Sequence, residues 1–301
     1  MDRTRVKIFL YVIDSGSLTK AASAFGYTTS GISHMMSTME EEVGFPLLIR
    51  SRSGVVPTAN ANRLIPILRS QLSWDEQLQQ TISDISGMNS GSITIAAYSS
   101  IAGQWLPTVI SRFHRDYPAI EINLLEGTWQ EVANYLSEHR ADMGFYSYQP
   151  SIKYHWVPLR NDKMVVIVPM NHPLAEQSSV KLSDLDNESI IMPAYGMDMD
   201  VQNVLKGRNP KHQFTTLETY SAFGMAEQGL GVVITNELTT KGRINRMKIL
   251  PFDPPMSISL GVAFPSDTQL TPAAAKFIDY AKVIIRDSSV FEEKRNDPLR
   301  D

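Results

Sequence analysis

The first 43 residues constrain the fold most, because their apolar spacing and their glycines mark three short helices. Apolar side chains recur at helical spacing over residues 5–13, and Gly16 follows as a stop signal. A second helix is expected over residues 18–25, with Gly26 supplying the turn after it. A third is expected over residues 28–43. Two helices joined by a short turn that contains glycine form a helix-turn-helix, whose second helix enters the major groove of DNA.

The third helix has two unlike faces. From Ile32 onward its apolar residues recur at helical spacing, and small polar side chains are left facing outward. By itself, this polar face fits contact with water better than contact with DNA, and His34 is equally well explained as a surface histidine. Short hydroxyl side chains nevertheless let a helix approach base edges and phosphates. The run LLIRSRSGVVP, residues 47–57, is typical of a hairpin wing that presents arginines to phosphates. The residues predicted to contact DNA are Thr28, Thr29, Ser30, Ser33, His34, Ser37, Arg50 and Arg52.

The residue order of this segment resembles the DNA-binding domain of the LysR-type transcriptional regulators. Their pattern is paired alanines, a leucine, a polar recognition segment, Leu-Glu, a glycine and Leu-Phe-x-Arg. The matching residues, in register without a gap, are Ala21-Ala22, Phe25, Thr28 to Ser33, Met39-Glu40, Gly44 and Leu47-Leu48-Ile49-Arg50. Thr29 stands where the family usually has a base-reading Gln, and PTANA stands where it usually has Leu-Thr-x-Ala-Gly. The resemblance implies a winged helix-turn-helix over residues 1–58. It does not indicate which operator sequence the protein prefers.

A long helix is expected next, because residues 59–86 contain no glycine and a single proline in the first turns. Its apolar stripe consists of Leu64, Leu68, Leu72, Leu78, Ile82 and Ile85. A stripe this narrow is typical of a seam for a partner helix, although a helix packed on its own domain is the alternative. In the resembled family this segment is a dimer strut. We therefore expect residues 59–91 to be a dimerisation helix followed by a hinge, in a homodimer or homotetramer.

Beyond the hinge, strands and helices alternate. A β-α-β-α-β order over residues 92–148 and a second such unit from residue 163 predict parallel sheets covered by helices. The order resembles the effector-binding domain of the same family, which is itself similar to periplasmic solute-binding proteins. The fold class predicted is α/β, with a two-lobed effector domain over residues 92–301. Lobe 1 is assigned to 92–162 and 266–289 and lobe 2 to 163–265, with a hinge near Asp162 and Pro265.

In the resembled family the ligand lies between the lobes, on the loop after the first strand and at helix starts. The resemblance, with the aromatic residues near strand ends, predicts an effector site at Ser99, Ser100, Ile101, Thr128, Tyr146, Tyr195, Tyr220 and Phe223. Backbone N–H groups at the helix start near Thr128 would attract an anion. The effector predicted is a small organic acid with an aromatic or apolar body. Tyr146 and Phe223 are equally well explained as core residues.

Several classes of function are excluded by composition. The net charge of −4 confines any DNA-binding surface to a local patch. The absence of cysteine excludes disulfides and thiol chemistry, including peroxide sensing by a thiol. No pair of histidines has metal-ligand spacing, GLGVVI lacks the third glycine of a dinucleotide site, and no hydrolase elbow is present. We expect no metal, no cofactor and no enzymatic activity. Without a signal peptide or a long apolar run, we expect a cytoplasmic protein that does not meet the membrane.

The function predicted is that of a sequence-specific DNA-binding transcriptional regulator, modulated by a small-molecule effector bound between two α/β lobes. Its expected partners are double-stranded DNA and the effector, with RNA polymerase as a candidate. An alternative is an effector-independent DNA-binding protein whose cleft is vestigial. A third possibility, a solute-binding or transport module, is disfavoured by the first sixty residues.

Overall fold

The computed structural model describes residues 2–51, 54–86, 90–208, 211–242, 244, 246–265 and 270–287, with the backbone alone at 212–213. The chain divides into two compact units, which are described separately. The N-terminal unit is Met1–Met88 with Glu138–Arg140, and the effector unit is Asn89–Ser137 with Ala141–Asp301. Among the described helices, none has both the length and the apolar composition needed to cross a lipid bilayer.

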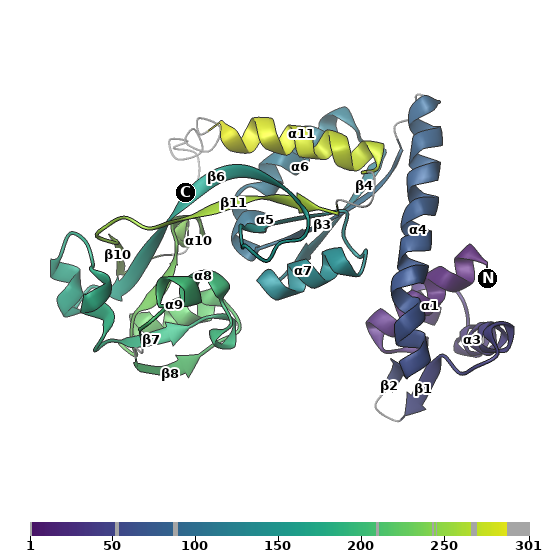
Figure 1. The fold of residues 1–301 in the computed structure, drawn as a ribbon, viewed down its shortest axis with the longest axis horizontal. Coiled ribbons are helices and arrows are strands. Elements are labelled where there is room, and N and C mark those ends of the chain that lie inside the picture. The colour runs from purple at the N-terminus through teal and green to yellow at the C-terminus, as the bar shows by residue number, and fades with distance from the viewer. Residues whose placement is uncertain are drawn as a thin grey trace. The chain divides into compact units, whose positions relative to one another are not determined.

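The N-terminal unit is a winged helix-turn-helix, as predicted (Figure 1). Its elements are α1 (Arg3–Ser15), α2 (Leu18–Phe25), α3 (Thr29–Val43), β1 (Leu48–Ser51) and β2 (Gly54–Pro57). The three helices end at Gly16, Gly26 and Gly44, each in the left-handed conformation that glycine adopts at little cost. Their apolar faces form one core, in which Phe9, Ile32 and Met39 are fully buried.

Glu40 connects the end of α3 to the wing. One of its carboxylate oxygens accepts hydrogen bonds from the backbone N–H groups of Leu47 and Leu48, at 2.7 and 3.0 Å. The wing also lies against the end of α1, because Val55 N–H donates to the Gly16 carbonyl at 2.9 Å. A Cβ added at Gly54 would lie 2.8 Å from that same carbonyl oxygen, so this close approach requires glycine. The wing is therefore held in place by both α1 and α3.

Helix α4 (Ala59–Ile85) carries the predicted apolar stripe, but the stripe has two different parts. Its first half packs on the core of its own unit through Leu64, Leu68 and Leu72. In its second half, Leu78, Ile82 and Ile85 are 57%, 48% and 81% exposed. The prediction that the stripe contacts a partner helix is wrong for its first half. There the alternative is confirmed, because the helix packs on its own domain. Only the second half is left uncovered.

The effector unit is built on one seven-stranded sheet in the order β10-β6-β11-β5-β3-β4, with β9 also pairing with β6. The strands are β3 (Gly91–Ala97), β4 (Ile120–Glu126), β5 (Met143–Ser147), β6 (His155–Pro169), β9 (Val233–Asn236), β10 (Met247–Pro251) and β11 (Ser257–Phe264). β3, β4 and β5 are parallel, as predicted for the first unit. β6 pairs antiparallel with β11, β9 and β10, so the parallel sheet predicted from residue 163 is wrong for these strands. The predicted α/β fold class is confirmed.

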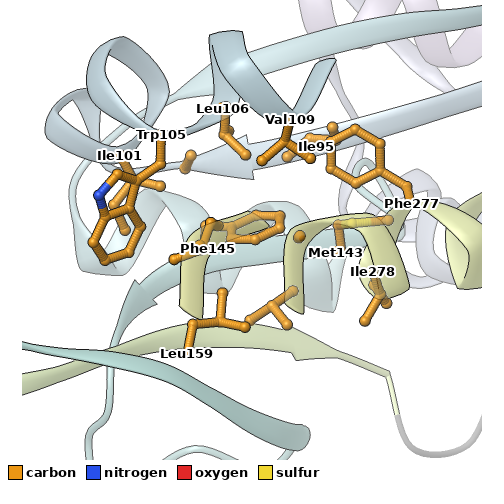
Figure 2. Packing of buried hydrophobic residues seen from close by; sticks show 14 of the residues in the cluster. Ile95, Ile101, Trp105, Leu106, Val109, Met143, Phe145, Leu159, Phe277 and Ile278 are labelled. Atoms are coloured by element: carbon orange, nitrogen blue, oxygen red, sulfur yellow. The ribbon is translucent and has the colours of Figure 1, made fainter. Parts of the chain in front are cut away.

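Lobe 1 covers both faces of its part of the sheet. Its helices are α5 (Ser99–Gln104), α6 (Leu106–Asp116), α7 (Trp129–Ser137) and α11 (Pro272–Arg286). α6 and α11 lie on one face, where Phe145 and Phe277 are buried in the main core (Figure 2). α7 covers the other face through Val132 and Leu136. The β-α-β-α-β order predicts one helix between β3 and β4, but Trp105 divides it into α5 and α6. The predicted loop after the first strand is already the start of α5.

Lobe 2 has a smaller sheet in which β7 (Ser189–Met192) pairs in parallel with β8 (Lys211–Thr215). Around it lie the 3₁₀ helices η1 (Pro173–Glu176), η2 (Leu182–Leu185) and η3 (Ala194–Gly196), and the helices α8 (Met199–Val204), α9 (Thr219–Glu227) and α10 (Glu237–Thr240). Sequence patterns did not predict α8 or β10. Leu238 of α10 is buried in the main core of lobe 1, so this short helix is a further contact between the lobes.

The chain crosses between the lobes on two long strands. β6 passes from lobe 1 near Asp162, where the prediction placed it, and its second half pairs with β9 and β10. The return was predicted at Pro265, and this is wrong. β11 already pairs with β5 of lobe 1 from Leu260 onward, so the return crossing lies at residues 257–259 and residues 260–265 belong to lobe 1.

Candidate DNA-binding surface and effector cavity

The polar residues of α3 form one accessible surface. Thr28 caps the helix, because its hydroxyl accepts a hydrogen bond from Gly31 N–H at 3.1 Å. Thr29, Ser30 and His34 are exposed, while Ser33 and Ser37 are half-buried. This matches the outward placement expected from the sequence, and their contact with DNA stays a prediction.

Arg50 of the wing lies beside this surface. Its guanidinium donates to the Ser33 hydroxyl at 2.8 Å and comes within 3.9 Å of the Glu40 carboxylate. These partners direct the cation toward α3, which joins the wing and the helix into one polar surface. Arg52 lies outside the described residues.

A cavity of about 500 Å³ lies between the lobes of the effector unit. Lobe 1 lines it with the end of β4, the start of α5 and the start of α7, and lobe 2 with α8, the start of α9 and the end of β9. Four of the predicted site residues are among its lining: Ser99, Ser100, Thr128 and Tyr220. Their role toward an effector stays a prediction.

The other four predicted residues do not line the cavity. Ile101 is fully buried in the main core of lobe 1, where it lies beside Trp105 (Figure 2). Phe223 is core in lobe 2, since α9 turns that side toward the sheet. Tyr146 is fully buried on the α7 face, because alternate residues of β5 point to opposite faces. Tyr195 is 61% exposed on η3. The prediction that these four residues line the cavity, Ile101 in the loop after the first strand and the other three as aromatic walls, is therefore wrong.

The cavity wall is acidic. The side chains that line it include the carboxylates of Glu126, Glu131, Asp198, Asp200 and Glu218, and no Arg, Lys or His is among its described lining residues. Glu131 also occupies the helix start that was expected to bind an anion. Its carboxylate accepts from Thr128 N–H at 2.8 Å and from the Thr128 hydroxyl at 2.9 Å. At Thr128 this geometry disfavours an anionic effector, because both donors of Thr128 are already paired with Glu131 and the surrounding charge is negative.

Asp200 is a buried residue of the wall and takes part in a hydrogen-bond network between the lobes. Gln149, which follows β5, donates to Asp200 at 2.9 Å and to Ser147 at 3.2 Å. Its carbonyl accepts from the amide of Asn203 in α8 at 3.1 Å, and Ser147 lies 3.0 Å from the Tyr98 hydroxyl. The network connects α8 of lobe 2 to the end of β5 and the start of α5 in lobe 1.

Burial dominates the titration of Asp200. It raises the pKa of this carboxyl from its usual 3.8 to about 7, and the nearby charge of Asp198 adds to the rise. Hydrogen bonds from Ser147, Gln149 and Tyr98 oppose the rise without cancelling it. Burial, followed by the charge of Asp200, also raises the pKa of the Tyr98 hydroxyl. Asp200 is therefore a buried carboxylate that a compensating positive charge in the cavity would stabilise.

Sequence reasoning missed the five carboxylates and Gln149. The positions of Asp198 and Glu131 can be predicted locally, because each carboxylate accepts a hydrogen bond from a backbone N–H group at the start of its helix. Asp200 and Glu218 also lie at the starts of helices and Glu126 ends β4, but no local pattern brings these three together. They meet only when β4, α8 and the α9 start come together.

Two protein-family models match the chain. The bacterial regulatory helix-turn-helix of the lysR family matches residues 4–62, and the LysR substrate binding domain matches residues 86–283. The uncharacterized HTH-type transcriptional regulator YvbU of Bacillus subtilis is 30% identical, covering 94% of this chain and 98% of its own. GltC of the same organism, a transcriptional dual regulator, is 24% identical over 93% and 96% of the two chains. These relatives are regulators of transcription rather than enzymes.

Solved structures agree in fold. A full-length OxyR variant from Pseudomonas aeruginosa superposes with a TM-score of 0.70 at 19% identity, covering 96% of this chain and 99% of that one. The effector binding domain of QuiR in complex with shikimate has a TM-score of 0.60 at 20% identity, covering 66% and 99%. At these identities the likeness shows the fold alone.

Proposed function

Because the chain belongs to the LysR family of DNA-binding transcriptional regulators, we propose that a small molecule held between its effector lobes controls its binding to specific DNA sites. The observation that carries the proposal is the cavity of about 500 Å³, a volume that suits a metabolite-sized ligand. Both lobes line this cavity and two strands join them, so a ligand that contacts both lobes would favour one lobe arrangement over another.

The proposed reading surface is the polar face of α3 together with Arg50. Hydroxyls and His34 would contact base edges or phosphates in the major groove, and Arg50 would meet a phosphate beside Ser33. The protein would work in the cytoplasm, with RNA polymerase as a further candidate partner.

The uncovered half of α4 is proposed as the dimer contact. Replacing Leu78 and Ile82 together by Lys is expected to raise the dimer dissociation constant by roughly 100-fold or more, because each buried Leu or Ile contributes about 1.5–3 kcal/mol. Both side chains are about half exposed, so the monomer fold should be unaffected. Sedimentation equilibrium measures the constant, with the exposed Gln79→Lys on the same helix as control. A double variant that stays as dimeric as the control would move the interface elsewhere.

The experiment on function combines DNA and ligand. Genomic fragments selected by the purified full chain are assayed by mobility shift, with and without a small-molecule extract of the source cells. We expect specific fragments whose binding the extract alters. Ser99→Phe, which places a ring in the cavity, should keep DNA binding and lose the response to the extract.

The control is Ser221→Phe, which adds the same ring at an exposed position of α9. If no fragment is bound specifically, the proposed function fails. If Ser99→Phe responds to the extract as fully as the control does, effector control through this cavity fails, and the alternative of a vestigial cleft is favoured.

A further inference from the structure

Resting on the proposed function, we infer that the ligand of the inter-lobe cavity is an organic cation, with ammonium or guanidinium groups held by carboxylates from both lobes. The sign of the wall's charge carries this inference. Glu126 and Glu131 come from lobe 1 and Asp198, Asp200 and Glu218 from lobe 2, without a basic residue among the described lining. A ligand that enters this space meets carboxylates from both lobes.

The carboxylates are not all equally available. Glu131 and Asp198 accept hydrogen bonds from the starts of their own helices, which holds them in place at the wall. Glu126 and Glu218 are exposed and lie on opposite lobes, at the end of β4 and just before α9. Asp200 is 8% exposed and lies beside the network of Gln149. A cation therefore has charges to meet both inside the cavity and at its rim.

Carboxylates that face each other from two lobes repel one another, which favours separation of the lobes. A cation between them turns that repulsion into two attractions and favours closure. It would also offset the desolvation of buried Asp200. The same ligand that neutralises the wall would thus bias the lobe arrangement, and this is how binding would reach the rest of the regulator.

The cavity suits an organic cation better than a metal ion. Among the described residues, no three acidic or histidine side chains converge closely enough to hold a metal. The volume of about 500 Å³ is also far larger than an ion. Tyr98, Trp129 and Tyr220 supply aromatic rings that attract ammonium groups, and Met164 and Met199 supply apolar wall for a methylene chain.

The experiment is calorimetry on the full chain with two matched sets of probes. The amines are 1,4-diaminobutane, 1,5-diaminopentane and agmatine, and the acids are succinate and glutarate, whose carbon chains have the same lengths as the two diamines. We expect at least one amine to bind and neither acid to do so. Glu126→Gln with Glu218→Gln should weaken amine binding by roughly tenfold or more.

The control pair is Glu121→Gln with Glu227→Gln, which removes the same charge from exposed positions of β4 and α9 outside the cavity. The inference is supported if amine affinity is lost in the variant with Glu126→Gln and Glu218→Gln and is kept in the control pair. Equal loss in both pairs, binding of the acids in preference, or no amine binding at millimolar concentration overturns it. The proposed function is judged separately by the extract assay, since Ser99→Phe can abolish that response whatever the charge of the ligand.

Discussion

Asp200→Asn is expected to raise the free energy of unfolding of the effector unit by about 2–4 kcal/mol at pH 8, because one unit of pKa shift corresponds to about 1.4 kcal/mol. The folded-state pKa of Asp200 is raised from 3.8 to about 7. A carboxyl whose pKa is raised by folding favours the folded state while it is protonated. That contribution is lost as the pH rises from the unfolded-state pKa of 3.8 to the folded-state pKa of about 7. Asparagine keeps a neutral group of the same shape and can still accept from Gln149.

The sign of the pH dependence makes this prediction specific. The gain should be near zero below about pH 4, grow between about pH 4 and 7, and stay level above. The charged group that acts on Asp200 is Asp198, at the start of the same helix, and Glu126, Glu131 and Glu218 line the same cavity. Tyr98, Ser147 and Gln149 are its polar partners.

Denaturant unfolding of the full chain at a series of pH values measures this gain. Glu227→Gln, an exposed change on α9, is the control and should show no such trend. An Asp200→Asn protein that is less stable than the parent throughout the range would show that Asp200 is needed as an anion in the folded state. The assignment of burial as the dominant influence would then be wrong.

Ser33→Glu is expected to abolish specific DNA binding, with a loss of roughly 100-fold or more at physiological salt. Ser33 lies at the centre of the polar surface of α3, where its hydroxyl accepts from Arg50 at 2.8 Å. A glutamate there would place an anion against the duplex and pair with the arginine that is proposed to meet a phosphate. Both effects oppose binding, and the first is the larger because the phosphate backbone is densely charged.

Fluorescence anisotropy with a selected DNA fragment measures the loss of affinity. Two further variants serve as controls. Ser33→Ala removes only the hydroxyl and should retain most of the affinity. Ser221→Glu adds the same charge to the effector unit and should leave DNA binding unchanged. Undiminished binding by Ser33→Glu would falsify the placement of α3 in the major groove. Arg52→Ala stays predicted to weaken binding to all sequences alike.

The DNA-binding unit was predictable from sequence because its signals are local. Glycines that end α1, α2 and α3, the Thr28 cap and the hairpin residues act within a few positions of themselves. The apolar period of α3 then settles which residues face outward. Glu40 was part of the matched pattern, yet its bonds to Leu47 and Leu48 became visible only in the structure.

A space between two lobes was predictable from sequence, but the residues that line it were predicted only in part. The alternation of strands and helices is enough to place a ligand between two lobes. It leaves open which side chains point there, because a strand residue faces either side according to what covers the sheet. Tyr146 faces α7 rather than the cavity for that reason.

What the sequence alone determined is the class of each part of the chain: a winged helix-turn-helix, a long helix and an α/β effector unit. These follow from periodicity and capping, which depend on neighbours within a few residues. Tertiary structure decided the sign of the charge that lines the cavity. The sequence indicates that Thr128 can donate to an anionic ligand, but in the structure its N–H donates to the carboxylate of Glu131. Glu126, Asp200 and Glu218 are far apart in the chain, and only the packing of two lobes gathers their charges around one space.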